Sequence, residues 1–319
     1  MEKLLEVKDL KVSFFTDLGE TQAVKDAGFA IEEGDFFGIV GESGSGKSVT
    51  TKSILRLGPS NCRIMGGEIL FQGEDILKKS EAELREIRGG EIAMIFQDSL
   101  SALNPVYTVG NKMVELIRRH TSMTKKEAKA RVLELLTAVG ITDPEKAMRS
   151  YPHELSGGMR QRVMIAMAMS SNPKVLIADE PTTALDVTIQ AQILHLLLEL
   201  QKKNNMSIIL ITHDLGVVAQ TCKRVAVMFG GYVVEEGTVE EIFLNPGHPY
   251  TQALIASMPR VGGTFEQFLE RDLSDGSGNL CPFLNRCKYA DKTCEACLPK
   301  YYESSEGHKI LCHRREEEK

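Results

Sequence analysis

Eight residues near the start of the chain have the types and spacing of a phosphate-binding loop. Residues 41–48 read GESGSGKS, which matches the pattern G-x-x-x-x-G-K-[ST]. The glycines let backbone N–H groups converge on phosphate oxygens, and the start of a following helix adds partial positive charge. Lys47 is expected to reach the β- and γ-phosphates, and the Ser48 hydroxyl to bind Mg²⁺. The alternative, a glycine turn whose lysine faces solvent, is disfavoured because all eight positions and both flanks fit.

Two carboxylates and a histidine follow apolar runs elsewhere in the chain. Residues 175–180 read VLIADE, so an apolar strand would deliver Asp179 and Glu180 to the mouth of a sheet. Asp179 could hold Mg²⁺ through water there, and Glu180 could polarise an attacking water. His213 follows the run IILIT and is expected on the same edge, as a contact to the γ-phosphate. A strand that ends in two carboxylates, or a histidine at a strand end, is by itself more often structural. These residues indicate catalysis only in combination with the phosphate loop.

The elements that must position these residues alternate between strand and helix. A buried strand at 36–40 precedes the glycine-rich loop, and a helix from 48 to 57 is predicted after it. Short β-rich runs from 3 to about 38 predict antiparallel strands. From 109 to 170 the pattern is helical, and after 174 strands and helices alternate again. This order predicts a parallel α/β core with an antiparallel β subdomain and an inserted helical subdomain.

The composition is that of an ordinary globular chain. Of its 319 residues, 42% are hydrophobic and 26% are charged, which excludes disorder as the main state. A net charge of −6 does not supply the positive field of a dedicated nucleic-acid binder, so we expect no nucleic-acid partner. No apolar run approaches the roughly 18 residues that a spanning helix needs, and the start of the chain does not resemble a signal sequence. We therefore expect a cytosolic chain that reaches a membrane only through partners.

A third motif connects the phosphate loop to a known family. The stretch LSGGMRQR at 155–162 resembles the signature motif of ATP-binding cassette (ABC) ATPases. Gln97 resembles the Q-loop glutamine of that family, residues 184–186 its D-loop, and His213 its switch histidine. The resemblance implies a P-loop NTPase fold with a RecA-like core that binds and hydrolyses MgATP.

The resemblance also implies a role for individual residues. Two cassettes are expected to face each other head to tail, so that Ser156 and the amides near Gly158 complete the γ-phosphate site in trans. Phe14 or Phe15 is the expected adenine-stacking aromatic, with a plain core position as the alternative. The expected catalytic residues are Glu180, His213 and Gln97, and the expected Mg²⁺ ligands are Ser48, Gln97 and, through water, Asp179. The residues expected around ATP are Phe14, Gly41, Ser43, Gly44, Gly46, Lys47, Ser48, Val49, Asp179, Ser156, Gly158 and Asp186.

A closer resemblance covers nearly the full length. Residues 150–194 and 248–260, the latter reading HPYTQALIASMPR, are similar to the oligopeptide, dipeptide and nickel import ATPases of bacteria and archaea. Within that group the sequence resembles the first of two paralogous ATPase subunits. This implies a heterodimer with the second subunit, two membrane permease subunits, an extracytoplasmic substrate-binding protein and a peripheral place on the cytoplasmic face of the membrane. The segment 98–110 is the expected permease contact, although the usual Asp-Pro of the family is Asp98-Ser99 here.

Two other functions use the same phosphate loop. Cassettes in DNA repair or translation usually come two to a chain, or carry long coiled-coil arms or basic surfaces, and the sequence has a single phosphate loop and an acidic balance. A small-molecule kinase does not need the signature motif, and Glu180 would activate water rather than a substrate hydroxyl. The expected domains are an ABC ATPase domain at 1–245, with a helical subdomain at about 98–170, and a C-terminal extension at 246–319. Dipeptides, longer peptides and nickel stay open as substrates.

Five of the seven cysteines lie after residue 280. Because a cytosolic protein seldom keeps structural disulfides, this clustering indicates a metal site. Cys281-x5-Cys287-x6-Cys294, followed by Cys312, is similar to the pattern that holds a [4Fe–4S] cluster in peptide-import ATPases. Structural Zn²⁺ is the alternative, since four thiolates also suit zinc and Cys294 and Cys297 have the close spacing that zinc favours. Cys297 is either a substitute for Cys294 or a spare thiol, and free thiols in a floppy tail are the third possibility.

Overall fold

The computed structural model describes residues 3–97, 102–183, 185–258, 280–304 and 307–315. Its strands are β1 (Lys3–Thr16), β2 (Gly19–Glu32), β3 (Phe36–Val40), β4 (Cys62–Phe71), β5 (Glu74–Asp75), β6 (Ile92–Ile95), β7 (Val175–Asp179), β8 (Ser207–Thr212), β9 (Arg224–Phe229), β10 (Tyr232–Thr238), β11 (Tyr301–Glu303) and β12 (Lys309–Leu311). Its helices are α1 (Lys47–Ile54), α2 (Glu81–Ile87), α4 (Val109–His120), α5 (Lys125–Ala138), α6 (Pro144–Arg149), α7 (Gly157–Ala168), α8 (Val187–Asn204), α9 (Leu215–Thr221), α10 (Val239–Leu244) and α11 (Pro249–Ala256).

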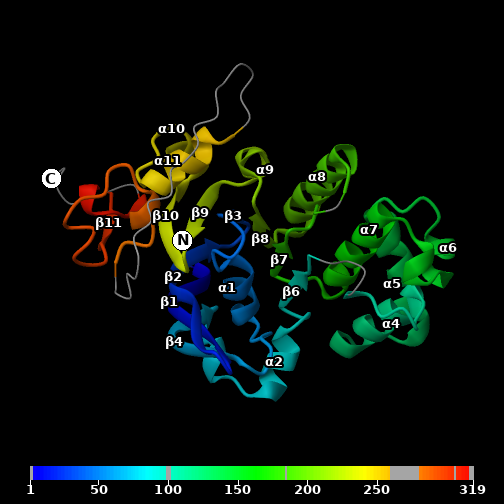
Figure 1. The fold of residues 1–319 in the computed structure, drawn as a ribbon. Helices are drawn as coiled ribbons and strands as arrows, with labels where there is room; N and C mark the ends of the chain where they lie inside the picture. Colours follow the sequence, from blue (N-terminus) through cyan, green and yellow to red (C-terminus); the bar gives the residue numbers. More distant parts are fainter. Residues whose placement is uncertain (1–2, 98–101, 184, 259–279, 305–306, 316–319) are drawn as a thin grey trace.

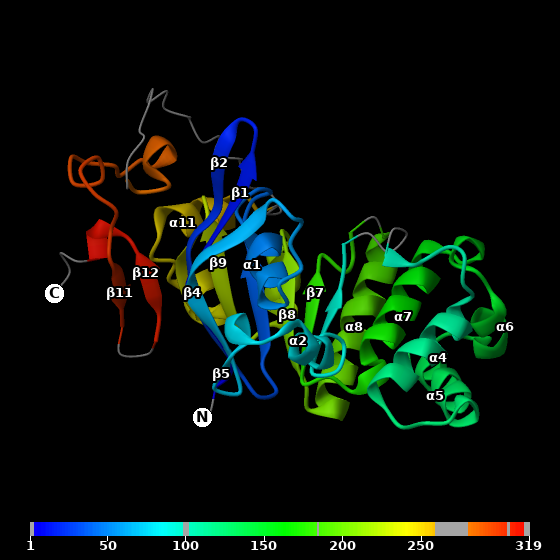
Figure 2. The ribbon, with the colours of Figure 1, turned by 90° about the horizontal axis from the view of Figure 1, so that it is seen from below.

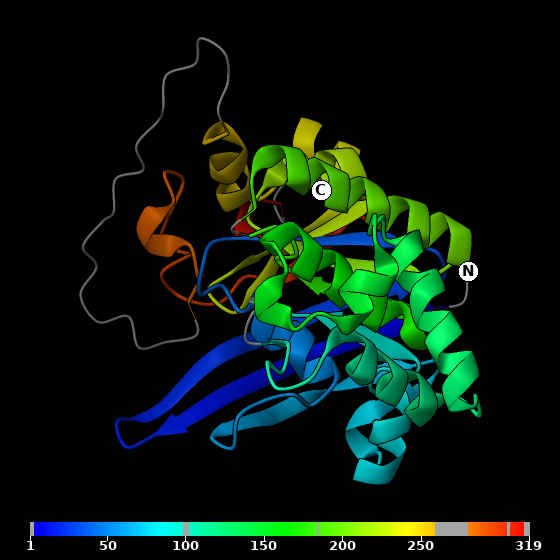
Figure 3. The same cartoon turned by 90° about the vertical axis from the view of Figure 1, so that its right-hand side faces the viewer.

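The molecule has a sheet in its centre and a group of helices at one side. Helices α4 to α7 gather to the right of the sheet in Figures 1 and 2, and the hairpin of β11 and β12 lies on the opposite side. In Figure 3 the helices face the viewer, and the hairpin of β1 and β2, in blue, projects beyond the other elements. The sheet is therefore the scaffold from which the helical group and the C-terminal region extend.

Five neighbouring strands form the parallel core of the sheet. The order is β9-β3-β8-β7-β6, and each neighbouring pair is parallel. Strands β3, β7 and β8 consist entirely of buried residues, as their continuous apolar runs predict for strands covered on both faces. The carboxyl ends of these strands consequently share one edge, and the loops that leave them are brought together.

An antiparallel sheet continues the parallel core. β1 pairs antiparallel with both β2 and β4, so the antiparallel strands predicted from residue 3 onward are confirmed. β2 joins the core through one parallel pairing with β10, Asp26 opposite Tyr232. Fully buried Leu5, Leu10 and Ile31 fill the space beneath these strands. β2 also reaches the phosphate loop, because a Cβ on Gly46 would lie 2.8 Å from the carbonyl oxygen of Ala23.

The helical pattern predicted from 109 to 170 is also present, as α4 to α7. All four helices are preceded by an N-cap residue whose side chain accepts a hydrogen bond from the first turn: Thr108 for α4, Thr124 for α5, Asp143 for α6 and Ser156 for α7. Their apolar faces meet in one core that includes buried Met113, Ile117, Val132, Leu136, Val163 and Ile165. Caps and apolar faces together explain why these segments form helices.

Several of the described residues after 245 pack on this sheet. β12 pairs antiparallel with β10, which places the end of the described chain alongside a strand of the main sheet. The buried carboxylate of Glu235 in β10 accepts hydrogen bonds from the backbone N–H groups of Gly247 (2.6 Å) and His248 (2.9 Å). It also contacts His308 Nε2 at 2.7 Å. One buried acidic side chain thus joins two separate parts of the C-terminal region, residues 247–248 and His308, to β10.

His248 gives this region a pH-dependent stability. Burial lowers the pKa of His248 to about 4, although the nearby Glu235 acts in the opposite direction. Between pH 6.5 and 4 the unfolded chain binds a proton at this histidine and the folded chain does not, so the stability falls as the pH falls. We expect a loss of about 2 kcal/mol from this residue between pH 7 and pH 5.

His248→Asn should reduce that loss, because the amide oxygen can replace Nδ1 as the acceptor for the N–H of Tyr250. The measurement is the difference in unfolding free energy between pH 7 and pH 5 for both proteins. Since the two proteins differ only at residue 248, equal pH slopes in both would show that His248 does not carry the effect.

Candidate nucleotide-binding and catalytic site

The phosphate loop connects β3 to α1 and depends on glycine at three positions. Gly41, Gly44 and Gly46 have φ values of 150°, 81° and 103°, which residues with a side chain rarely adopt. A Cβ on Gly41 would lie 2.1 Å from the carbonyl oxygen of Met228, and one on Gly46 would lie 2.8 Å from that of Ala23. The loop is therefore packed against neighbouring backbone, and a side chain at Gly41 or Gly46 would displace it.

Lys47 lies over this loop and is only 6% exposed. Its Nζ donates to the carbonyl oxygens of Gly41 (2.7 Å) and Glu42 (2.8 Å). Burial lowers the pKa of Lys47, whereas the carboxylates of Glu180, Asp179 and Glu42 act to raise it. A buried ammonium at the mouth of a glycine loop can meet phosphate oxygens without first losing a full hydration shell.

Ser48 and Asp179 form the second part of the site. The Ser48 hydroxyl donates to Asp179 Oδ1 at 2.8 Å, and Asp179, the last residue of β7, is 1% exposed. Burial raises the pKa of Asp179, while the hydrogen bond from Ser48 and the charge of Lys52 lower it. Asp179 Oδ2 is buried without a hydrogen-bond partner among the described residues, and Lys52 Nζ is 3.9 Å away. A hydroxyl beside such a carboxylate oxygen is a donor set that suits Mg²⁺.

The three expected catalytic side chains meet at Glu180. Gln97 Nε2 and Thr183 Oγ1 each donate to Glu180 Oε2 at 2.9 Å, and His213 Nδ1 is 3.4 Å from Oε1. Glu180 has a positive φ of 47°, and its N–H donates to the carbonyl of Ile211 in β8. Strained backbone of this kind costs of order 1–3 kcal/mol and points to a functional constraint. The carboxylate is oriented by three neighbours, as a group that must position water would require.

The signature residues lie elsewhere in the same chain. Ser156 begins α7, and its hydroxyl accepts a hydrogen bond from Met159 N–H at 3.3 Å. A Cβ on Gly158 would lie 3.1 Å from the side chain of Ile189. Asp186 begins α8 and accepts from the N–H of Ile189. α7, which follows Ser156, belongs to the helical group and lies apart from α1 in both Figures 1 and 2.

The remaining expected contacts are placed as follows. Phe14 and Phe15 are both half-buried in β1, and the Arg63 guanidinium lies 5.1 Å from the Phe15 ring centroid. Ser43 is exposed on the loop, and Val49 packs from α1 against the core. The choice of Phe14 as the adenine partner stays a prediction. Asp98, Ser99 and Ala184 of the predicted loops lie outside the described residues.

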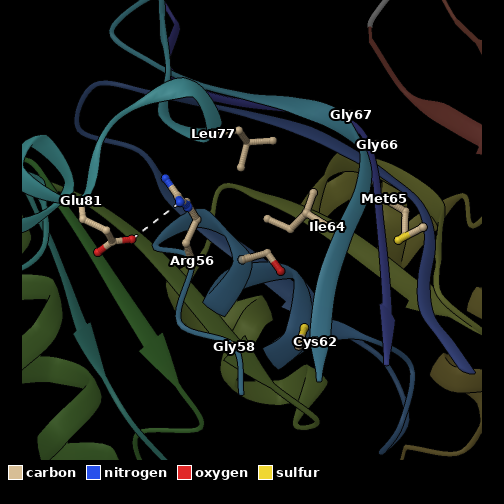
Figure 4. Close-up of a pocket in the computed structure, with 10 residues that line it drawn as sticks. Arg56, Gly58, Cys62, Ile64, Met65, Gly66, Gly67, Leu77 and Glu81 are labelled. Carbon is tan, nitrogen blue, oxygen red and sulfur yellow. Dashed lines mark ion pairs between the residues drawn. The ribbon is translucent and has the colours of Figure 1, made fainter. Parts of the chain in front are cut away.

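A cavity of about 500 Å³ lies at the other end of α1 (Figure 4). Its lining residues are Ser53, Arg56, Gly58, Cys62, Ile64, Met65, Gly66, Gly67, Leu77 and Glu81. Arg56 in this cavity contacts the Glu81 carboxylate at 3.6 Å and donates to the Lys79 carbonyl at 2.7 Å. The C-terminal end of a helix carries partial negative charge, which disfavours phosphate. The cavity is therefore separate from the nucleotide site.

The C-terminal cysteines are partly gathered. Cys287, Cys294 and Cys312 are buried, Cys281 is half-buried, and Cys297 is exposed. Burial raises the pKa of Cys281 to about 12, and the neighbouring thiols of Cys294, Cys312 and Cys287 add to the rise. In the part of the chain that the structure describes, no three metal-binding side chains converge closely enough to hold a metal ion. Four of the thiols are thus neighbours, but they do not surround one position.

Comparison with known protein families decides the identity of the fold. A family model described as ABC transporter matches residues 24–183, which include the phosphate loop, the signature stretch and Glu180. The chain belongs to the ABC transporter ATPase family. A second model, described as the C-terminal region of oligopeptide/dipeptide transporters, matches residues 234–294 of this ABC ATPase.

Individual relatives agree with this assignment. The oligopeptide transport ATP-binding protein OppD of Bacillus subtilis is 56% identical over 268 residues, covering 84% of this chain and 75% of its own length. The dipeptide transport ATP-binding protein DppD of the same organism is 49% identical over 319 residues, covering 98% and 95%. A solved dimeric ATP-binding cassette with bound ADP and phosphate matches with a TM-score of 0.67 and 29% identity, over 74% of this chain and 98% of that one. This ABC ATPase accordingly has the cassette fold and hydrolyses ATP.

Some features of the site were not expected from sequence. Thr183, beside Glu180, and Lys52, beside Asp179, carry no motif that separates them from ordinary polar residues. Glu42 in the phosphate loop contacts Tyr250 and Arg286, more than 200 positions later in the chain.

No described helix is long and apolar enough to cross a membrane.

The geometry predicts different failures for two substitutions. Lys47→Ala removes the buried ammonium from the loop, so MgATP binding should weaken strongly. Glu180→Gln keeps the shape and the binding charges but removes the group that polarises water. It should therefore bind MgATP and hydrolyse it about 10²–10⁴-fold more slowly.

The measurements are MgATP dissociation constants and steady-state phosphate release in the assembled complex. Glu199→Gln, an exposed carboxylate on α8, is the matched control and should leave both unchanged. Wild-type phosphate release by Glu180→Gln would rule out the assigned role.

Proposed function

We propose that this ABC ATPase is the ATP-binding and ATP-hydrolysing subunit of an importer for oligopeptides or dipeptides. The observation that carries the proposal is the match of residues 234–294 to the C-terminal region of oligopeptide/dipeptide transporters. The relatives named above for oligopeptide and dipeptide transport support it. A role in DNA repair or translation is not favoured, because the matched C-terminal region is described as that of transporters, and that description names oligopeptides and dipeptides as the substrates.

In this proposal each ATP is held between two cassettes. One chain supplies the phosphate loop with Lys47 and Ser48, and the facing cassette supplies Ser156 and the N–H groups near Gly158 at the start of α7. The partial positive charge at the start of a helix suits the negative γ-phosphate. Within one chain α7 lies apart from α1, so the facing cassette would have to supply this helix start. The related cassette with bound ADP and phosphate is dimeric. We propose a paralogous ATPase subunit as the second cassette, and Gln97 as a Mg²⁺ ligand once ATP is bound.

The permease subunits are proposed to dock beside Gln97. A groove of about 300 Å³ lies there, and Phe96, Leu103, Met164 and Met167 are among its apolar lining residues. It is formed by the segment after β6 together with α4 and α7, so a docked permease would touch both the catalytic glutamine and the helical group. This arrangement would place the chain peripherally on the cytoplasmic face of the membrane, with a substrate-binding protein acting on the permeases from the other side.

The C-terminal extension, proposed as residues 246–319, is proposed to carry a [4Fe–4S] cluster on Cys281, Cys287, Cys294 and Cys312. Three of these thiols are buried, and all four are close enough to influence the pKa of one another, whereas Cys297 is exposed. The cluster would act as a staple for the described residues after 280, which form only short strands and 3-10 turns. Zn²⁺ on the same residues is the alternative.

Transport by the assembled complex tests the function. The chain, its paralogous subunit and two permease subunits are reconstituted in vesicles, and uptake of a labelled oligopeptide is measured with the binding protein present. Uptake should require ATP, and the ATPase rate should rise on assembly because each site needs two cassettes. Hydrolysis at full rate by the isolated chain, or a complex that hydrolyses ATP without moving any peptide, would contradict the proposal.

Val106→Asp examines the permease contact within the same assay. Val106 is 74% exposed in the predicted permease segment, so the change should not disturb the fold. Peptide uptake should fall severalfold while MgATP binding stays the same. Leu244→Asp introduces the same charge at another exposed apolar position, 68% exposed on α10, and should leave uptake intact.

Metal analysis after anaerobic purification tests the cluster. About four irons with matching sulfide are expected per chain, and Cys287→Ser should lose most of them. Cys297→Ser is the matched control and should keep the full content. One zinc per chain would support the alternative, and fresh reduced protein without metal would refute both.

A further inference from the structure

The C-terminal region contacts the phosphate loop at Glu42, the residue directly after Gly41. Arg286 lies in a short 3-10 turn (Leu284–Arg286) and donates from both terminal nitrogens to the Glu42 carboxylate, at 2.8 and 2.9 Å. Two parallel bonds of this kind fix both the position and the plane of the carboxylate. The Tyr250 hydroxyl in α11 accepts a hydrogen bond from the Glu42 N–H at 3.0 Å. The loop is thus held by its backbone and by its side chain.

Aromatic rings support both contacts. Tyr250 is 1% exposed, and its ring lies 4.5 Å from that of Phe229 and 5.5 Å from that of Phe283. The Arg286 guanidinium is 5.6 Å from the centroids of both Phe229 and Phe283. Stacking on rings restricts the rotamers of a long cationic side chain. Arg286 is therefore presented to the loop in a nearly fixed orientation.

The start of α11 is itself anchored to the main sheet. The backbone N–H of His248 donates to buried Glu235, and His248 Nδ1 accepts from the N–H of Tyr250 at 3.0 Å. Tyr250 therefore reaches the loop from an element whose position is set by β10. Displacement of the C-terminal region would consequently remove support from the phosphate loop.

The charge of Glu42 makes this contact matter for the ligand. A carboxylate in this loop lies beside the site of the most negative part of ATP, and an unpaired negative charge there would repel the phosphates. The Glu42 carbonyl also accepts from Lys47 Nζ, so any shift of Glu42 moves the lysine that binds phosphate. Arg286 opposes both the repulsion and the shift, because its positive charge compensates the carboxylate of Glu42 and its two hydrogen bonds hold Glu42 in place.

We propose that Arg286 is a positioning residue for ATP binding, through which the C-terminal region sets the affinity of the phosphate loop for MgATP. The inference rests on the part of the proposed function that places ATP on this loop. It does not depend on peptide transport.

Rescue by charge removal tests the proposal in the full chain. Arg286→Met keeps an aliphatic stem against the rings and removes the positive charge, and the dissociation constant for MgATP, measured by calorimetry, should rise roughly three- to tenfold. The double variant with Glu42→Gln should return to within about twofold of wild type, because the repelling charge is gone. Damage to the fold of the extension would not be repaired by Glu42→Gln.

Lys288→Met is the matched control, because it removes one positive charge two positions away at an exposed residue. It should leave MgATP binding unchanged. Wild-type affinity in Arg286→Met, or a double variant as weak as the single one, would overturn the proposal. Failure of the wild-type chain to bind MgATP would refute the proposed function and this inference together.

Discussion

The parallel alignment of β3, β8, β7 and β6 is the constraint on which the chemistry of this protein depends. Each strand ends at the same edge of the sheet, so the loop before Lys47, the turn at His213, the carboxylate of Glu180 and the amide of Gln97 become neighbours. Backbone hydrogen bonds between the strands fix the register, in which Ala178 of β7 lies opposite Leu210 of β8. The site is therefore only as precise as the buried sheet that carries it.

Burial of charge is the second physical feature of the site. Lys47 and Asp179 are each less than a tenth exposed, and burial disfavours the charged form of both. Nearby opposite charges and the Ser48 hydroxyl compensate part of this cost. A ligand that brought negative phosphate to Lys47 and a divalent cation to Asp179 would relieve the remainder. On this ground we expect the site to prefer MgATP over either component alone.

The C-terminal region is connected to this site more closely than its position in the sequence suggests. Its strand β12 pairs with β10 of the main sheet, and the N–H of Gly247 donates to Glu235 of β10. Tyr250 and Arg286 of the same region bind Glu42 in the phosphate loop. The region whose match indicates peptide transport therefore also contacts the phosphate loop. A segment that distinguishes one group of ABC ATPases from others can in this way influence the step that all of them share.

The sequence by itself determined the local features of this protein. The phosphate loop, the apolar strand before Asp179 and Glu180, the helices from 109 to 170 and the signature stretch follow from patterns within a few residues, because backbone propensity and hydrophobic periodicity act over that distance. Only the tertiary structure decided which distant groups meet. Thr183 on Glu180, Lys52 beside Asp179, and Tyr250 and Arg286 on Glu42 depend on how separate elements pack, and no local pattern encodes such a contact. For the same reason the sequence could align the cysteines with a cluster motif, while their burial was set by the packing of the described residues after 280.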